Sequence, residues 1–547
     1  MARPRKKATP APKPPAATGT AWDRLSGGAQ HGVCLAILLA VAVGFFAPAL
    51  FSGKSLIGGD TVQWRATAQS MLDYRAAEGE EPLWATNTFA GMPGYLISYE
   101  RAVPQLDAIP AWLRGFAWPA SHFIFLLLGT YLLVVFLTQN QLGAVLAAVA
   151  YGLTTYLPVI LVAGHNTKFV ALCFAPWLVL AFVFALRRPG LLAGLLFAAA
   201  LAVNLRAGHV QITYYVAFLL GVWWLAEGVG ALRRKDAKPF GTATAWLALG
   251  AVLGVLMVAD PYLVTAEYKN YSIRGAAAGG GEGSLAWDYA MGWSQGWGEL
   301  VTLLVADAYG GSAAYWGPKP FTGGPHYVGG IVLLLAGLAL WRYRRNAVTA
   351  LGIGTLLMVL FSLGEHLELI NRPMFAFFPL FDAFRVPETW LSIVALALAV
   401  LAGLGLFYAV RPEAERGAEA RKTRAVEIAC GVAVGLALLL WVGRGVFFDF
   451  EKDGEYEQIV RLVEQQRPDL APQADAIAAQ ELDRRAEERA DAYAGDALRT
   501  LVFLVLAALA LVAYRREKIP AWAMQAALVL LVVVDLGGVG RRYFNED

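Results

Sequence analysis

The stretch "HGVCLAILLAVAVGFFAPALF", residues 31–51, decides the fold class of this chain. It contains no Asp, Glu, Lys or Arg, and a helix of this length spans a hydrocarbon core of roughly 30 Å. Runs of similar length recur down the whole chain of 547 residues, of which 58% are hydrophobic and 16% are charged. This composition is too apolar for a soluble domain and predicts an all-α polytopic membrane protein.

Apolar runs predict about thirteen transmembrane helices. Their approximate ranges are 31–51, 119–138, 141–162, 169–186, 190–205, 209–230, 241–260, 326–341, 347–364, 389–410, 425–447, 498–514 and 519–539. The basic, Pro- and Ala-rich segment 1–30 is expected to be a disordered cytoplasmic tail. With that tail inside, the basic loops all fall on the cytoplasmic side, as the positive-inside rule requires. They are 187–190, 233–238, 342–346, 411–424 and 515–518.

This orientation places the N-terminus in the cytoplasm, the C-terminus outside, and the long loops on the outer side. Residues 31–410 are expected to form a transmembrane core with outer loops 52–118, 261–325 and 365–388. Residues 411–547 are expected to add C-terminal helices and an outer helical hairpin, 448–497, broken at "RPDLAP". The hairpin carries many charges and is interpreted as a solvated surface. The segment 61–77 has helical spacing and could lie in the membrane interface.

Asp60 follows the first crossing in "SLIGGDTVQW", behind two glycines. It could be a helix N-cap, because an Asp before "TVQW" can accept backbone N–H bonds at a helix start. It could also be a general base held at membrane level, where a carboxylate is costly to desolvate and is retained for function. The two interpretations do not exclude each other.

Two short outer turns each carry a cation and a histidine. His165 and Lys168 lie three apart in "GHNTK", and Arg206 and His209 lie three apart in "RAGHVQ". On a helix this spacing places both side chains on one face, which would form a cradle for a phosphate. Snorkelling cations with helix-end histidines are the structural alternative. A metal site has less support, because neither histidine has a nearby carboxylate in sequence, although Asp60 could join them in space.

The outer loop 261–325 combines aromatic residues with scattered charges. Glu267, Arg274, Glu299 and His326 lie among Tyr and Trp residues, an arrangement that suits a sugar ring with apolar faces and hydroxyl groups. Farther on, Arg385 and Glu388 stand at a helix entrance as a candidate ion pair. The chain has no P-loop, no GxSxG motif and no GxGxxG motif in Rossmann context. Nucleic-acid binding is not expected, because the net charge of +3 is spread over the loops.

Several stretches, taken in order, resemble the bacterial YfhO-like membrane protein family, a branch of the GT-C glycosyltransferase superfamily. They are "GGDTVQW", "EPLWATNTFAGMPGY", "GHNTK", "AGHVQ", "EYKNYSIRG", "WSQGWGE", "AYGG", "YWG", "FRVPE" and the closing "VVVDLGGVGRRYFN". The resemblance implies a multi-pass enzyme of the bacterial inner membrane. It would use a polyprenyl-phosphate-linked sugar at the outer leaflet and modify a cell-envelope polymer or glycan, such as a teichoic acid.

In that family the catalytic acidic residue lies in the first outer loop, and Asp60 is the residue here that matches. GT-C sites often pair two adjacent acidic residues; here a second carboxylate would have to come from Glu267 or Glu299. The donor phosphate would be bound by His165, Lys168, Arg206, His209 and Arg274. Substrate-binding roles are expected for Trp64, Asn87, Gln211, Tyr271, His326, Arg385 and Glu388. No cofactor is required by these residues, and a need for Mg²⁺ or Mn²⁺ is left open.

The sequence therefore predicts an inverting glycosyltransferase with Asp60 as the general base. The alternative is a transporter or flippase of a lipid-linked saccharide, in which many spans and intramembrane charges are equally expected. Transporters usually gather polar groups near mid-membrane and show paired repeats. Here the polar groups cluster at one face and no repeat is found, which favours the enzyme.

Overall fold

The chain folds almost entirely into helices. The computed structural model describes residues 20–99, 104–269, 271, 285–343, 345–410 and 424–545. Within these ranges the sole sheet pairs Trp84–Ala85 (β1) with Met92–Pro93 (β2), antiparallel. Ten helices of the described residues are long and apolar enough to cross a membrane, and a bent pair makes an eleventh if it is counted as one span. The chain is therefore an all-α multi-pass membrane protein.

The ten candidate spans cover most of the apolar runs expected from the sequence. They are α1 (Gly27–Phe45), α5 (Ala120–Thr138), α6 with α7 (Gln141–Gly152 and Tyr156–Ala163), α8 (Asn166–Arg187), α10 (Val210–Arg234), α11 (Ala237–Leu256), η7 with α17 (Pro387–Trp390 and Leu391–Val410), α18 (Ala425–Val442), η9 with α21 (Pro468–Gln473 and Ala474–Arg515) and α22 (Ala521–Tyr543).

Three of the thirteen expected spans coincide with shorter helices. They are α9 (Leu191–Arg206), α14 (Gly330–Arg342) and α15 (Asn346–Ser362). At about 1.5 Å per residue, α14 is only ~20 Å long, which is less than a hydrocarbon core. After α15 the chain bends by 115° through η5 (Gly364–Leu367) into α16 (Glu368–Phe377). Thirteen spans thus stay a prediction.

The first apolar run is divided where the sequence introduces a proline. The helix α1 ends at Phe45, and α2 (Ala47–Phe51) starts one residue later, with Pro48 in its first turn, where a missing N–H is tolerated. At the other end, Ser26 caps α1 by accepting a bond from Ala29 N at 3.2 Å. The sequence predicted a disordered tail up to residue 30. Residues 27–30 are instead helical, so that prediction is wrong for them. The segment 1–19 lies outside the described residues.

The centre of the bundle is α17, which is buried along nearly its whole length between α14, α15 and α6. Small residues allow this close packing. At Gly405, for example, an added Cβ would collide with the backbone of Leu335 in α14. The three cysteines, Cys34, Cys173 and Cys430, are buried and unbridged. They pack in the apolar core, as their positions in the sequence predict.

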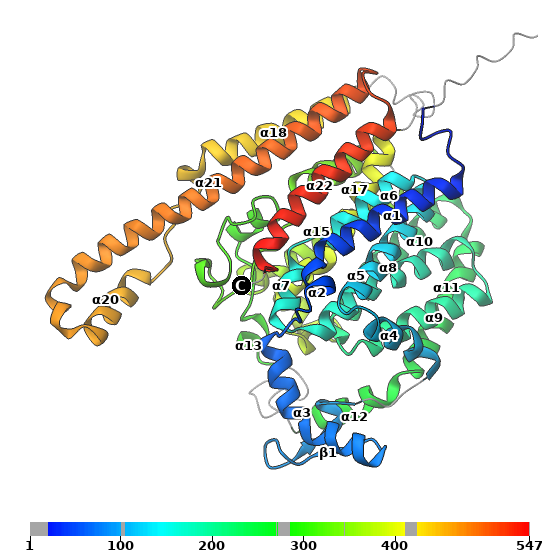
Figure 1. Cartoon of the computed structure of the whole chain (residues 1–547). Coiled ribbons are helices and arrows are strands. Elements are labelled where there is room, and N and C mark those ends of the chain that lie inside the picture. Colours follow the sequence, from blue (N-terminus) through cyan, green and yellow to red (C-terminus); the bar gives the residue numbers. More distant parts are fainter. Residues whose placement is uncertain are drawn as a thin grey trace, which may run out of the picture.

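The described parts of loops 52–118, 261–325 and 365–388 fold into short helices beyond one end of the bundle; they keep the name outer loops, after the side that the sequence predicts for them. In Figure 1, α3 (Gly59–Glu78), β1 and α12 (Ala259–Lys269) lie together below the apolar helices. The hydroxyl of Tyr99 joins two of these loops by donating to Asp260 at 2.6 Å. The other short elements are η1 (Gly94–Leu96), α4 (Pro104–Gly115), α13 (Trp287–Met291), η3 (Gly298–Leu303), η4 (Ser312–Ala314) and η6 (Phe381–Ala383).

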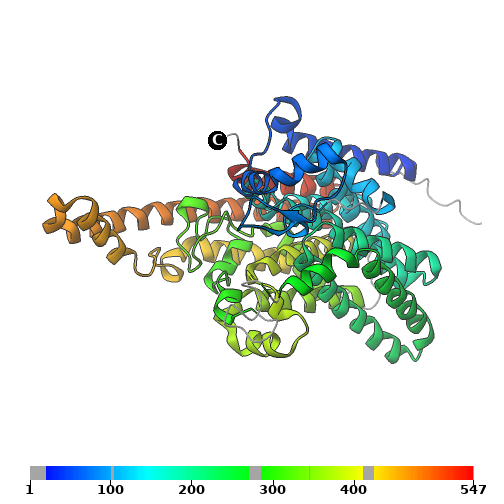
Figure 2. The ribbon, with the colours of Figure 1, turned by 90° about the horizontal axis from the view of Figure 1, so that it is seen from below.

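A helical arm projects from the bundle. It consists of α20 (Glu455–Gln466) and the first half of α21, which turn back on each other at Pro468–Gln473, and it follows α19 (Arg444–Phe447). Figures 1 and 2 show it extending well past the other helices. Inside the arm, the buried Glu455 accepts hydrogen bonds from Arg485 and Arg489 at 2.7–2.8 Å. Burial raises the pKa of Glu455, but these two guanidinium groups outweigh it and hold the pKa below its usual value.

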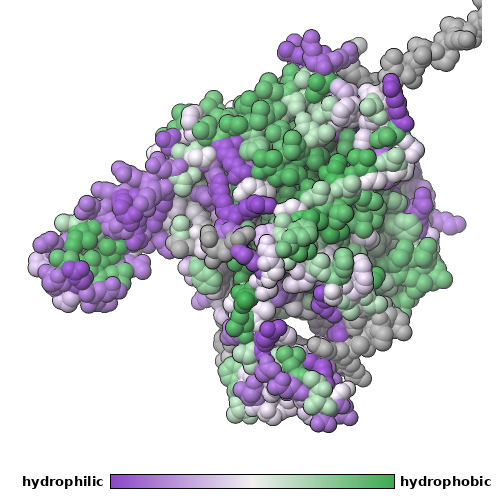
Figure 3. Space-filling model, viewed as in Figure 1, coloured by the Kyte–Doolittle hydropathy of each residue, from purple (hydrophilic) through white to green (hydrophobic). Residues whose placement is uncertain are grey.

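The surface separates into two chemical regions (Figure 3). Hydrophobic side chains cover the bundle over α1 and α22, whereas the arm is mostly hydrophilic. An apolar surface of this kind on a helical bundle is the surface that a bilayer covers. The arm and the loops around α3 lie at the same end of the helices as the end of α22 (Figure 1).

Candidate functional site

Asp60 lies in the first turn of α3, at the end of the bundle where these loops lie, with its side chain 59% exposed. The residue at the N-cap position is Gly58, and no side chain caps this helix. The structure thus contradicts the interpretation of Asp60 as an N-cap. Its carboxylate is instead directed to a neighbouring turn and stays open to solvent.

The start of α3 fits closely against the turn between α7 and α8. A Cβ added to Gly58 would lie 2.6 Å from the backbone of Gly164, and one added to Gly164 would lie 2.9 Å from Thr61 N. Gly164 also has φ +91°, a conformation that glycine adopts without strain. Asn166 fixes the contact by donating from Nδ2 to Thr61 Oγ1 at 3.0 Å. The glycines of "GGDT" and "AGHNTK" therefore bring the two motifs together.

This contact places His165 beside Asp60. The imidazole Nε2 lies 3.0 Å from Asp60 Oδ2, and the side chain of His165 is 42% exposed. Burial and the nearby Lys168 lower the pKa of His165, and Asp60 offsets this only in part. A neutral imidazole with its proton on Nε2 donates a hydrogen bond to Oδ2 of Asp60. It orients the carboxylate and leaves its negative charge in place.

The same turn supplies positive charge. His165 is the N-cap residue of α8 without making a side-chain cap bond, and Lys168 lies in the first turn. The first N–H groups of a long helix carry partial positive charge and favour anions. The ammonium of Lys168 lies 5.9 Å from the centre of the Tyr156 ring. Sequence analysis placed His165 and Lys168 together, and the structure does the same.

The second turn, between α9 and α10, packs beside the first. Arg206 ends α9 and His209 is the N-cap residue of α10. Between them lies Gly208, with φ +80°, where an added Cβ would lie 3.6 Å from Cγ2 of Thr167 in α8. The two turns predicted to form the cradle are thus neighbours at the same end of the bundle.

A buried ionic network lies in the outer loops. The ammonium of Lys319 is 2.6 Å from Glu388 Oε2 and 3.3 Å from Glu299 Oε1, and it also donates to Gln295 Oε1 at 3.0 Å. Tyr315 donates its hydroxyl to Glu299 Oε1 at 2.7 Å. Burial lowers the pKa of Lys319, but Glu388 and Glu299 more than compensate and raise it above its usual value. The side chains of Lys319 and Glu299 are 4% and 2% exposed, so this network excludes solvent.

His326 and Tyr156 connect this network to the Asp60 turn. The rings of His326 and Tyr156 stack with centroids 4.5 Å apart, and His326 Nε2 lies 4.0 Å from Glu388 Oε2. Burial, opposed in part by Glu388, lowers the pKa of His326 to about 4. Lys168 is close enough to lower the pKa of both His326 and His165. The predicted residues His165, Lys168, His326, Glu388 and Glu299 therefore belong to one continuous region.

Arg385 and Glu388 do not form the ion pair that the sequence predicted. Glu388 pairs with Lys319, whereas Arg385 donates to the hydroxyl of Tyr289 and lies over the rings of Tyr289 and Trp293, 5.0 and 5.9 Å from their centres. Between them lies Val386 with φ +64°, so the two side chains do not follow one regular helix.

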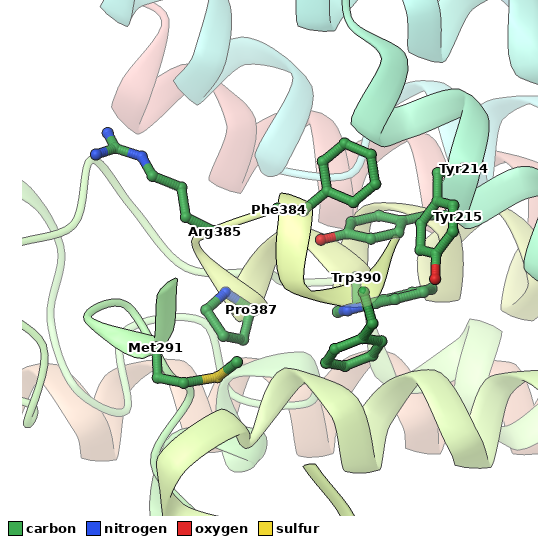
Figure 4. Close-up of a pocket in the computed structure, with 8 residues that line it drawn as sticks. Tyr214, Tyr215, Met291, Phe384, Arg385, Pro387 and Trp390 are labelled. Atoms are coloured by element: carbon green, nitrogen blue, oxygen red, sulfur yellow. The ribbon is translucent and has the colours of Figure 1, made fainter. Parts of the chain in front are cut away.

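A small aromatic pocket lies beside Arg385. Its residues are Tyr214, Tyr215, Met291, Phe381, Phe384, Arg385, Pro387 and Trp390. Figure 4 shows the guanidinium of Arg385 pointing away from the rings. Gln211 closes one side, since its Nε2 donates to both the Arg385 carbonyl and the Tyr215 hydroxyl at 2.6 Å. Gln211 thus holds α10 to the 381–390 segment.

Other predicted site residues lie apart from this region. Trp64 donates to the Ile97 carbonyl, and Asn87 bonds with Ser70 and with the backbone of α3. Both hold the first outer loop onto α3. Glu267 is exposed on α12, near Tyr95, and Tyr271 is 80% exposed just after this helix. Arg274 lies outside the described residues.

Sequence reasoning missed Lys319, Tyr315, Gln295 and Tyr156. Lys319 stands in "WGPKPF", a stretch of turn-forming residues that is usually exposed, and nothing in it predicts a buried ammonium. Glu299 and Glu388 come from two different loops, so the sequence carries no direct signal that these two carboxylates share one buried cation. Tyr156 lies inside an apolar run and has no polar sequence context.

Within the described ranges, no group of three or more His, Cys, Asp or Glu side chains could hold a metal ion. Comparison with family models, with curated proteins and with solved structures finds no match to this chain.

Proposed function

We propose that this protein is a glycosyltransferase of the GT-C type, which moves a sugar from a polyprenyl-phosphate donor to a cell-envelope acceptor at the outer face of the membrane. The observation that carries the proposal is the pairing of Asp60 with His165, 3.0 Å apart, beside Lys168 and the start of α8. It combines an exposed, oriented carboxylate with positive charge at the end of an apolar bundle.

In this mechanism Asp60 is the general base. As the oxygen of the acceptor hydroxyl attacks the anomeric carbon, its proton passes to Asp60, and the bond from that carbon to the donor phosphate breaks. The attack comes from the face opposite the phosphate, so the configuration inverts. A base positioned in this way typically contributes a factor of about 10²–10⁴ to the rate.

Negative charge develops on the departing phosphate. Lys168 and the first N–H groups of α8 would stabilise that charge, together with Arg206 and His209 in the neighbouring turn. Fixed donors at such a position act most strongly where charge appears in the transition state. The apolar surface of Figure 3 allows the polyprenyl chain to stay in the bilayer while the phosphate reaches the turn.

The buried network supports the site without facing the acceptor. Glu299 is engaged by Lys319, Tyr315 and Gly296 N, so it has little capacity to accept a substrate proton. We therefore place Asp60 alone as the base and assign Glu299 and Glu388 to the framework behind it. Tyr289, Trp293 and Arg385 form an aromatic and cationic surface suited to a sugar ring.

The test uses the purified protein in proteoliposomes with a panel of labelled polyprenyl-phosphate sugars and an envelope extract as acceptor. Free polyprenyl phosphate and labelled polymer should form together in equal amounts. Lys168→Ala should raise the donor concentration needed for half-maximal rate. Movement of intact donor between leaflets with no sugar transfer would reject the enzyme in favour of a transporter.

A further inference from the structure

An apolar groove runs along the outside of the bundle between its first and last helices. Both α1 and α22 pack on α6, but they make little contact with each other. The groove between them has a volume of about 600 Å³ and is lined by these three helices. The two helices lie side by side in Figure 1, and Figure 3 shows hydrophobic side chains over them.

Glycines keep the groove wide. A Cβ added to Gly44 would meet no atom within 4 Å, and one added to Gly537 would approach only Leu153, at 3.9 Å. Neither glycine is therefore needed for close helix packing. All the lining residues except Arg541 are apolar or glycine, so nothing along the groove offers a hydrogen bond from a side chain.

The groove matches an extended hydrocarbon chain in length and lining. It follows α22 from Ala526 to Arg541. This part of the helix is about 22 Å long. Its lining is apolar up to Arg541, as a lipid acyl chain requires.

One charge lies at the end of the groove. Arg541 donates from Nη2 to the carbonyl of Gly44 at 2.7 Å, and so joins the ends of α22 and α1. A guanidinium has five N–H donors in a planar fork that matches a phosphate, and this bond uses one of them. The side chain is exposed near the end of the last candidate span, where a membrane-crossing helix leaves the hydrocarbon core.

We propose that this groove is a binding site for an anionic glycerophospholipid, with one acyl chain between α1 and α22 and its phosphate on Arg541. The lipid would fill the gap that the two helices leave. The end of α22 also carries Arg542 and Tyr543, which bond to Asp307 in the outer loop at 2.7 and 2.8 Å. An occupied groove would thus stabilise the outer loop through α22. This inference does not depend on the proposed enzymatic activity.

The experiment compares lipids and variants on the delipidated full chain in detergent. Phosphatidylglycerol and phosphatidylcholine with identical acyl chains are added, and bound lipid is counted by native mass spectrometry beside the thermal unfolding midpoint. The parent should retain one phosphatidylglycerol and unfold at a higher temperature with it. Arg541→Gln should weaken this binding about tenfold, the effect of losing one charged hydrogen bond.

Gly44→Leu should fill the groove and abolish binding. Gly32→Leu is the matched control, because it lies on the same helix outside the groove and its added Cβ also meets nothing within 4 Å. Without lipid both variants should unfold like the parent, which shows that they fold. Equal retention of the two lipids, or unchanged binding in Gly44→Leu, would show that the groove contacts membrane lipids without binding a specific one. Preferential retention of added polyprenyl phosphate would show that the groove binds this lipid and not the proposed glycerophospholipid.

Discussion

The imidazole Nε2 of His165 lies 3.0 Å from Oδ2 of Asp60, across a contact between two segments about a hundred residues apart in sequence. In the proposed mechanism His165 would be a positioning residue, because it contacts the carboxylate of the base. His165→Ala should lower kcat/KM about tenfold, the value of one hydrogen bond to a charged group.

A double-mutant cycle checks that prediction. In an Asp60→Asn background, His165→Ala should cause no further loss, because the group that it orients is already gone. Independent, multiplicative losses would show that His165 acts on something other than Asp60.

Gly164 is the residue that allows the two segments to meet. Gly164→Ala should lower the free energy of unfolding by about 1–3 kcal/mol and reduce activity with it, because φ is +91° and the added Cβ lies 2.9 Å from Thr61 N. Gly59 lies next to Asp60, but a Cβ added to it would meet no atom within 4 Å. Gly59→Ala should therefore change neither the free energy of unfolding nor the activity. Similar behaviour of the two variants in thermal unfolding and transfer assays would contradict the proposed contact.

Lys319 neutralises two buried carboxylates. Lys319→Met should destabilise the protein by about 3–5 kcal/mol, because it leaves Glu299 and Glu388 buried without a cation. Adding Glu299→Gln and Glu388→Gln to the same variant should recover part of the loss. Arg467→Met removes an exposed pair with Asp469 and should leave the thermal unfolding midpoint unchanged. An equal effect of Lys319→Met and Arg467→Met would rule out the buried network.

His326 should make stability depend on pH. Its pKa is about 4 in the fold and about 6.5 in the unfolded chain, so between these values the unfolded chain binds more protons. The free energy of unfolding therefore has its full value above pH 6.5. It falls by about 1.4 kcal/mol per pH unit as the pH drops toward 4. The lowered pKa of His165 acts in the same direction.

The measurement is the unfolding midpoint at pH 7 and pH 5. His326→Phe keeps the stacking on Tyr156 and should show a smaller drop between the two pH values than the parent. His366→Gln, on the exposed η5, should behave like the parent. A parent-like drop in His326→Phe would assign the titration to another group.

The fold class could be read from the sequence because long uncharged runs have few alternatives to membrane-spanning helices. Helix ends could not be read as well. The break at Phe46 and Pro48 and the continuation of α21 from the polar arm into the bundle depend on local backbone geometry and packing, which hydropathy does not record.

The candidate site was predictable only in part. His165 and Lys168 share one turn, so sequence spacing alone places them together. Their contact with Asp60 depends on Gly58 and Gly164 meeting across about a hundred residues, and the burial of Lys319 between Glu299 and Glu388 depends on the fold of the outer loop. The predicted pair of Arg385 and Glu388 was wrong, because closeness in sequence does not set side-chain direction across a turn with positive φ.

The central claim is that Asp60 is the base of a sugar transfer. Its most direct test is single-turnover transfer from a labelled polyprenyl-phosphate sugar, with the parent compared with Asp60→Asn and with Asp73→Asn, which changes another exposed aspartate of α3. We expect Asp60→Asn to slow transfer by a factor of about 10²–10⁴. Asp73→Asn should match the parent, and both variants should keep the parent's unfolding midpoint. Transfer at the parental rate by the folded Asp60→Asn variant would contradict it.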